Sequence, residues 1–360
     1  MKKSKIIWSI FLVVQIIILN IVSFFPEAIE KYYSNGFYLW LSKISRTLFG
    51  GLPFSFGDIA YTVLICFLIY RLYKRRAQLF SWASWKMDWK SKTLSVLSFI
   101  SIFYFLFNCL WGLNYHRVPL YAKMKLDKDY TLEELQAFTK QMIAKTNEIH
   151  SQIVKNDNLK VDNPYEIEKI YALTQDGYDE LGKKYSYFQY QIPSIKKSLV
   201  SLPLTYMGFG GYLNPFTNEA QVNYKIPKYN FPTTVCHEMA HQIGYASESE
   251  ANFIGYLASI NNQNIYFKYS GYSYALKYCL GNIEKIEEGK SKELLPLIHP
   301  GILKNFQESK DFWDSYQTPI DTFFHYFYDH FLKINQQKDG LESYSKFVGL
   351  MIGYYKNHPL

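Results

Sequence analysis

The sequence predicts a mainly helical chain in which three transmembrane helices precede a soluble α+β domain with a small β-sheet. Two observations lead to this prediction. The first 117 residues contain three long apolar runs, whereas residues 118–360 have a soluble composition, helix-start patterns and one alternating segment. We therefore divide the chain into a membrane region, 1–117, and a second domain, 118–360, which is long enough to bury its own core.

The three apolar runs cover about residues 6–25, 56–70 and 94–113. About twenty apolar residues cross a bilayer as a helix, so the first and third runs suffice, and the second does so with its Phe-rich lead-in. The first run follows a short basic start and ends without a small-residue cleavage site. This favours an uncleaved anchor, with a cleaved signal peptide as the alternative. For the second and third runs the alternative is buried core helices.

The distribution of basic residues predicts the orientation of the chain. Lysine and arginine gather at the N-terminus and in the predicted loop 71–92, and are sparse in the predicted loop 26–57. The positive-inside rule places 71–92 in the cytoplasm, so three spans leave residues 118–360 outside it. The formal charge is +8, but the lysines are scattered and no nucleic-acid-binding motif is present. We expect a lipid bilayer, and no nucleic acid, as a partner.

Helix-start signals mark the first helices of the second domain. Thr131 and Glu134 form a capping-box pattern that opens a helix to about Val154. Pro164 opens another helix, which runs to about Tyr185.

Shorter segments supply the predicted sheet. Residues 195–202 are expected to form a short helix or strand, and Glu219–Tyr224 alternates as a strand does. Further helices are expected near residues 249–263, 272–288, 303–315, 318–334 and 341–355.

The most informative stretch is His237-Glu238-Met239-Ala240-His241. On a helix, residues four apart lie on one face, so the imidazoles of His237 and His241 can bind one cation. Glu238 lies one step round the helix, within reach of a water on that cation. Two neutral nitrogen ligands, an open position and a carboxylate base are what a zinc hydrolase needs. We therefore expect Zn²⁺ as the cofactor and Glu238 as the catalytic base.

A third ligand is expected from the next helix. Gly244 can end the first helix in a left-handed conformation and let the chain turn back. Ser247 and Glu250 then read as a capping box, which gives Glu250 a structural role and leaves Glu248 free to bind the metal. Glu248 is the predicted third ligand and Glu250 the alternative. Asn252, four residues after Glu248, is expected to hydrogen-bond one of the ligands.

The pattern His237-Glu238-x-x-His241 followed by Glu248 and Asn252 resembles the gluzincin metallopeptidases, which include thermolysin and the membrane proteases of the prenyl-protein and heat-shock type. The resemblance implies a zincin-like fold, a glutamate as third ligand and peptide-bond hydrolysis. Two features depart from the gluzincin pattern. Asn252 stands where those families have aspartate, and the gap from His241 to Glu248 is much shorter than theirs.

The wider layout resembles a second group. Three spans, then Asn114-Tyr115-His116-Arg117, then the segment Gly211–Ala220 and the histidine motif are similar to an uncharacterised family of bacterial membrane proteins, carried as a domain of unknown function. That resemblance covers most of the chain. It implies a multi-pass protein of the bacterial cytoplasmic (inner) membrane with an extracytoplasmic C-terminal domain.

Together these patterns predict a membrane-anchored, zinc-dependent metallopeptidase that acts on a peptide or protein at the membrane surface. The alternatives are a zinc hydrolase of a non-peptide cell-envelope amide and a non-catalytic membrane scaffold. Glu219 and Asn223, on the predicted strand, are candidates for pairing with an extended substrate, and an ordinary edge strand is the other interpretation. An oxyanion-stabilising group is expected from the aromatic C-terminal part, although core packing suffices to explain these residues: Tyr326, Tyr328, His325 and His330.

Overall fold

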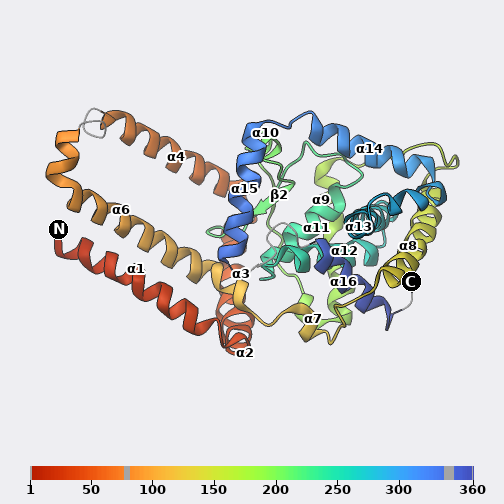
Figure 1. Cartoon of the computed structure of the whole chain (residues 1–360), viewed down its shortest axis with the longest axis horizontal. Coiled ribbons are helices and arrows are strands. Elements are labelled where there is room, and N and C mark those ends of the chain that lie inside the picture. The colour runs from red at the N-terminus through yellow and green to blue at the C-terminus, as the bar shows by residue number, and fades with distance from the viewer. Residues whose placement is uncertain (1, 77–81, 336–343, 359) are drawn as a thin grey trace.

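The computed structural model describes the chain except residues 1, 77–81, 336–343 and 359 (Figure 1). It confirms a mainly helical chain with a small three-stranded sheet and three apolar helices in its N-terminal part. The three apolar helices extend to one side, and the other helices and the sheet form the body of the molecule (Figure 1).

The long N-terminal helices are α1 (Lys2–Val22), α4 (Phe56–Lys74) and α6 (Trp82–Leu110). Within them, Lys3–Val22, Phe56–Lys74 and Trp89–Leu110 are long and apolar enough to cross a membrane. Few residues of these three segments are buried within the protein, as expected where lipid replaces a protein partner. Inside the bundle the Gln15 amide donates to the hydroxyl of Ser101 at 2.9 Å, joining α1 to α6.

Two predicted loops are largely helical. The predicted loop 71–92 is shorter than expected, since α4 continues to Lys74 and α6 begins at Trp82; residues 77–81 of that loop lie outside the described part. Lysine and tryptophan do not interrupt a helix, so α6 begins well before the apolar run that starts at about residue 94.

The predicted loop 26–57 contains α2 (Pro26–Ala28), the π-helix η1 (Ile29–Phe37) and α3 (Tyr38–Phe49). Ile29, Tyr33 and Tyr38 bury one face of this segment together with Trp111, which follows α6. Burial of these large side chains stabilises a segment whose local composition is moderately polar.

The remaining helices belong to the second domain, except η2, which follows α6 at the end of the membrane region. The capping box predicted at Thr131 is present and opens α8. The helical elements are η2 (Gly112–His116), α7 (Leu120–Lys123), α8 (Leu132–Ile153), α9 (Ile167–Lys184), η3 (Ser186–Phe188), α10 (Ser201–Tyr206), α11 (Phe231–Gln242), α12 (Glu248–Asn261), α13 (Ile265–Ile286), η4 (Lys290–Glu293), η5 (Leu295–Leu297), α14 (Pro300–Asp314), α15 (Pro319–Ile334) and α16 (Tyr344–Tyr355).

The sheet has the order β1-β3-β2, from β1 (Ile195–Lys197), β2 (Gly211–Leu213) and β3 (Ala220–Val222). β1 is parallel and β2 antiparallel to β3. The predicted strand 219–224 is therefore the central strand, and its assignment to an edge is wrong. β1 and β2 cover both its edges. The sequence predicts a helix or strand at 195–202 and no strand at 211–213, because three residues are too few to show an alternation.

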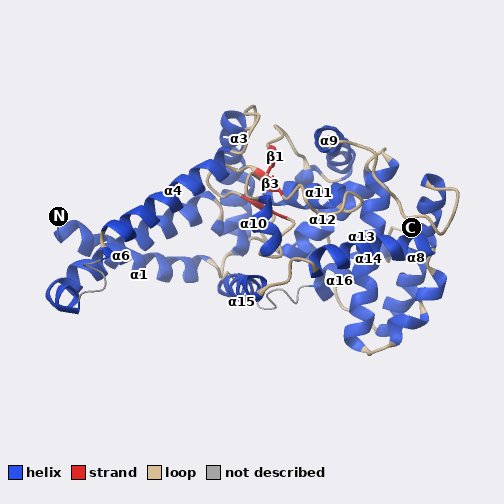
Figure 2. Ribbon diagram, turned by 90° about the horizontal axis from the view of Figure 1, so that it is seen from above, coloured by secondary structure: helices blue, strands red, loops and turns tan. Residues whose placement is uncertain are grey.

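Helices α11 and α12 form the centre of the second domain and pack against each other, next to the sheet (Figure 2). Nearly every residue of both helices is buried. Gly255 of α12 permits this close approach, because a Cβ there would lie 2.8 Å from the backbone nitrogen of His237. The histidine motif is thus held on two rigid elements in the core.

Candidate metal centre

Three side chains from α11 and the start of α12 converge on one point. The Nε2 atoms of His237 and His241 lie 3.1 Å apart. Glu248 places one carboxylate oxygen 3.3 Å from Nε2 of His237 and the other 3.8 Å from Nε2 of His241. Ligands about 2.0–2.2 Å from a tetrahedral ion lie roughly 3.3 Å from each other. The three side chains can therefore share one cation without moving far.

The turn between the two helices aims Glu248 at the histidines. Gly244 has φ +91°, a left-handed conformation that favours glycine, and its N–H donates to the carbonyl of His241. The chain reverses here, and α12 begins at Glu248 itself.

The capping box predicted at Ser247 is absent. Ser247 is the N-cap residue, but its side chain makes no cap hydrogen bond and lies 3.0 Å from the hydroxyl of Ser249. Glu250, the alternative ligand, points away from the histidines and accepts the backbone N–H of Leu120 at 2.6 Å. The structure therefore brings Glu248, and not Glu250, to His237 and His241.

Neighbouring groups set the orientation and the protonation of the two histidine rings. Nδ1 of His241 donates to the carbonyl of Tyr245 at 2.7 Å, which leaves the lone pair of Nε2 directed at the site. Burial lowers the pKa of His241 to about 4, so this ring is neutral, as a metal ligand must be. Burial also acts on His237, but Glu248, Glu238 and Asn252 outweigh it and raise the pKa. Asn252 in turn accepts the Tyr274 hydroxyl at 2.7 Å.

Glu238 is a buried carboxylate beside this group. Its atom Oε2 has no hydrogen-bond partner among the described residues. Burial, and to a lesser extent the charge of Glu248, raises the pKa of Glu238 to about 8, although His237 acts in the opposite direction. Strand β2 passes directly alongside, since a Cβ on Gly211 would lie 2.6 Å from Oε1 of Glu238. A carboxyl group held this way can exchange a proton near neutral pH.

Among the four aromatic and histidine candidates of α15, Tyr328 reaches the site. Its hydroxyl donates to Oε1 of Glu248 at 2.6 Å. His325 pairs with Asp321 at 3.0 Å, and the ring of Tyr326 lies against His330, with ring centroids 4.0 Å apart. The polar and ring contacts of these three side chains join them to other residues of α15 and not to the metal centre.

The two substrate-strand candidates have structural roles instead. Glu219 is fully buried and accepts the backbone N–H groups of Phe56 and Gly57, at 3.1 and 2.6 Å, which satisfies the start of α4. The amide of Asn223 donates to the Thr205 hydroxyl and to the carbonyl of Phe209. Both side chains are turned towards these partners and not towards the histidines.

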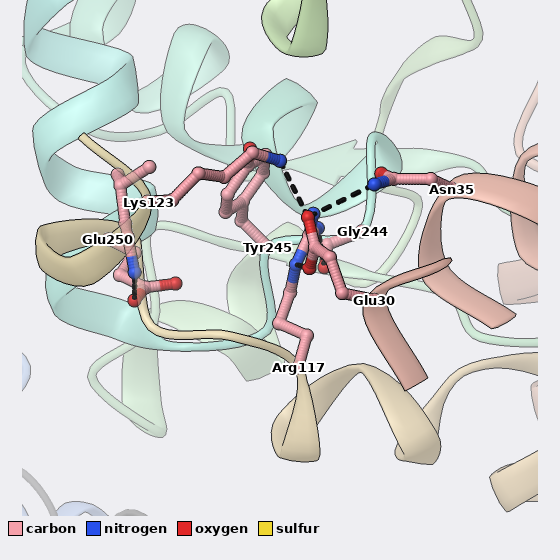
Figure 3. Close-up of polar contacts among 8 residues, drawn as sticks. Glu30, Asn35, Arg117, Lys123, Gly244, Tyr245 and Glu250 are labelled. Atoms are coloured by element: carbon pink, nitrogen blue, oxygen red, sulfur yellow. Dashed lines mark hydrogen bonds and ion pairs between the residues drawn. The ribbon is translucent and has the colours of Figure 1, made fainter. Parts of the chain in front are cut away.

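Sequence reasoning missed a charged cluster that joins the membrane region to the loop after α11 (Figure 3). Arg117 donates to both carboxylate oxygens of Glu30 at 2.8 Å and to the carbonyl of Gly244 at 2.8 Å. Its guanidinium lies over the ring of Tyr245, 4.0 Å from the centroid, and Lys123 donates to Glu30 at 2.6 Å. The available signal was the position of Arg117 and Glu30, each a few residues beyond a span.

Electrostatics keep this cluster ionised. Burial alone would raise the pKa of Glu30, but hydrogen bonds and charge from Arg117 and Lys123 outweigh burial and bring the pKa down to about 2. A second contact from the same region is made by Tyr38, whose hydroxyl donates to the carbonyl of Gln242 at 3.1 Å. The end of α11 is therefore held by the membrane region as well as by its own domain.

A second group of possible ligands lies elsewhere, where the end of α8 meets the start of α14. Nδ1 of His150 is 3.2 Å from Nδ1 of His299, which is 3.4 Å from a carboxylate oxygen of Asp157. Nε2 of His150 donates to the carbonyl of Leu159. This group and the group at Glu248 are the two sets of possible metal ligands among the described residues, so a metal analysis has to distinguish them.

The fold and the site define a class: a mainly helical protein with three candidate membrane spans and a largely enclosed group of two histidines and a glutamate. By sequence, the chain belongs to a family described as protein of unknown function (DUF3810), whose model matches residues 33–352. The expectation of an uncharacterised family is thus confirmed, and the gluzincin resemblance stays a prediction. No curated protein and no solved structure matches the chain.

Proposed function

We propose that the chain is a membrane-anchored, zinc-dependent metallopeptidase with a zincin-like second domain. The observation that carries the proposal is the convergence of His237, His241 and Glu248 next to the buried, unpartnered carboxylate oxygen of Glu238. The basic N-terminus and the basic segment after α4 support an extracytoplasmic second domain, on the bacterial inner membrane. The substrate is then a peptide or protein at the membrane surface.

The donor set fits zinc. Two imidazoles and one carboxylate with a fourth position open are the ligand set of catalytic zinc sites in peptidases. When bound, Zn²⁺ supplies Lewis-acid chemistry at this point. His241 offers a neutral Nε2 fixed by Tyr245, and Glu248 has its second oxygen held by Tyr328. These contacts limit rotation of both side chains before a metal arrives.

Glu238 is the group that moves protons. It takes the proton of the attacking water and returns it to the leaving amine. The absence of a hydrogen-bond partner for Oε2 among the described residues leaves that oxygen free for both steps. Tyr328 holds Glu248 in this arrangement and so acts as a positioning residue.

Strand β2 takes over the substrate-pairing role that Glu219 and Asn223 do not fill. Tyr212 stands opposite Gln221 in the antiparallel ladder, and the carbonyl of Gly210 accepts the N–H of Asn223. Backbone groups alternate in direction, so those of Gly211 and Leu213 point away from β3, along the edge beside Glu238. An extended peptide added to this edge would pass the proton-transferring carboxylate.

Metal content of the purified full chain tests the proposal. We expect one zinc equivalent to be lost in His241→Ala and in Glu248→Gln, because each removes a ligand. Glu250→Gln is the matched control for Glu248→Gln and is expected to keep the zinc. His299→Ala controls for the second group. Zinc that survives His241→Ala and disappears in His299→Ala would overturn the proposal.

Adding a methyl group to Gly211 is expected to displace Glu238. The new Cβ would lie 2.6 Å from Oε1, so Gly211→Ala should lower peptide hydrolysis by roughly 10–100-fold while zinc stays bound. Gly210→Ala is the control, since its Cβ meets only the side chain of Thr234, at 3.3 Å. Equal activity of the two variants would contradict the prediction that strand β2 positions Glu238 for hydrolysis.

A further inference from the structure

Helix α15 carries an apolar stripe that faces outwards. Ile320, Phe323 and Phe327 follow the spacing of one helix face, and their exposed fractions are 52%, 61% and 55%. Tyr326, beside them, is 66% exposed. Burial of such side chains in an apolar medium is favourable, so a stripe of this kind marks a surface that another phase or molecule covers.

The polar residues of α15 gather on another face. Asp321, His325, Asp329 and Lys333 recur every four residues, with Asp321 paired to His325 and Asp329 to Lys333. The loop between α10 and β2 lies against this polar face, because a Cβ on Gly208 would lie 2.8 Å from side-chain atoms of both Asp321 and His325. The helix thus has a polar face directed at the domain and an apolar face directed elsewhere.

The apolar stripe leads to the membrane spans. Phe331, four residues after Phe327, packs against Phe107 of α6, with ring centroids 6.1 Å apart, and against Tyr115, 6.3 Å away. Phe107 belongs to the candidate span Trp89–Leu110. Figures 1 and 2 show α15 lying crosswise at the domain end of the spans. This is the level of the headgroup region of a bilayer that holds α1, α4 and α6.

Helix α3 provides independent support for that level. Trp40, Ile44 and Leu48 recur every four residues on one face and are 60%, 38% and 65% exposed. α3 also lies at the domain end of the spans, on the other side from α15 (Figure 2). Tryptophan and tyrosine concentrate at membrane–water interfaces. The exposed apolar faces of α3 and α15, which carry Trp40 and Tyr326, therefore indicate the same interface level.

The inner side of α15 reaches the candidate metal centre. Tyr328 donates to Glu248, and its ring packs edge-on against Phe209, with centroids 5.0 Å apart. Phe209 lies just before strand β2, the edge beside Glu238. A single helix therefore touches the third ligand, the approach to β2 and the level of the headgroups.

We propose that α15 lies in the headgroup region of the membrane as a lipid-bound cover over the metal centre. Its apolar stripe contacts the lipid acyl chains. Because the helix has few basic residues, burial of apolar surface, and not attraction to anionic lipid, drives its binding to the membrane. Resting on the function proposed above, this placement names the substrate class: a polypeptide held at the membrane, entering between α15 and β2 from the bilayer surface. An untethered peptide has no such advantage.

Depth-dependent quenching in nanodiscs tests the placement. A fluorophore is attached to Phe323→Cys, to Phe327→Cys and, as a matched control on the polar side, to Thr322→Cys, with Cys66 and Cys109 replaced by serine. We expect spin-labelled lipid to quench the labels at 323 and 327 while aqueous iodide does not, and the reverse at 322. Iodide access at 323 and 327 equal to that at 322 would overturn the proposal. So would shielding of these labels in detergent that grows with protein concentration, since a second copy would then cover the stripe.

An activity measurement tests the consequence for substrates. Phe323→Ser combined with Phe327→Ser should lower cleavage of a lipid-tethered peptide by roughly tenfold or more, and leave cleavage of the same peptide without its lipid unchanged. Equal loss on both peptides would contradict membrane delivery. If no variant, wild type included, cleaves either peptide, the peptidase proposal fails, whereas the quenching result still decides where α15 lies.

Discussion

Replacing Glu238 by Gln is expected to lower peptide hydrolysis by about 10²–10⁴-fold while the zinc content stays at one equivalent. Glutamine keeps the shape of the side chain beside Gly211 but cannot take up a proton. The fold should tolerate the change, because Oε2 of Glu238 makes no hydrogen bond to the described residues. Steady-state kinetics and metal analysis on the same preparation measure both quantities.

His237→Ala is the companion variant, since it removes a ligand and should lose zinc and activity together. In cells, Glu238→Gln and His237→Ala are expected to give the same phenotype if hydrolysis is the function. A phenotype that survives Glu238→Gln and disappears in His237→Ala would show that the metal centre is structural. The non-catalytic scaffold would then replace the peptidase as the interpretation.

Local sequence signals predicted the core of the candidate site. The spacing of His237 and His241 depends on helix geometry alone, and Gly244 supplies the turn that returns Glu248 to them. The supporting argument about Glu250 was wrong, because a capping box is a local preference and this carboxylate instead accepts a hydrogen bond from a distant donor, the N–H of Leu120. The structure thus brings Glu248 to the two histidines, although the capping box that was the reason for preferring it is absent, and its role as a metal ligand stays a prediction.

Features that depend on distant parts of the chain could not be predicted in this way. The order of strands is set by pairing, and nothing within residues 219–224 indicates that β1 and β2 cover both sides of β3. Glu219 contributes to the start of α4, which is more than 160 residues away in sequence. Likewise, the helices between Pro26 and Phe49 form because Tyr38 and Trp111 meet at the end of α11, a packing that composition does not reveal.

The largest expected effect on stability comes from Arg117, the link between the spans and the loop after α11. Arg117→Met leaves the largely buried carboxylate of Glu30 with Lys123 as its remaining cationic partner, beside the amide of Asn35, and loss of one partner of a buried ion pair costs about 3–5 kcal/mol. The change also frees the carbonyl of Gly244, one residue before the carbonyl that orients His241. We therefore expect a lower unfolding temperature in detergent and roughly 10–100-fold weaker zinc binding.

Lys123→Met is the matched control, because Lys123 also pairs with Glu30 but meets the loop after α11 at the side chain of Tyr245, whereas Arg117 binds the backbone carbonyl of Gly244. It should lower the unfolding temperature and leave zinc affinity unchanged.

The pH dependence of stability follows from the pKa of Glu30, which is lowered from 4.5 to about 2 in the folded chain. The stabilisation by Glu30 is then complete above about pH 4.5 and disappears as the pH falls towards 2. Glu30→Gln should accordingly lower the unfolding temperature at pH 7 and make little difference near pH 2.

Equal weakening of zinc binding by Arg117→Met and Lys123→Met would contradict the link to the metal centre. The cluster would then act only through overall stability, and contacts from the membrane region would not orient His241.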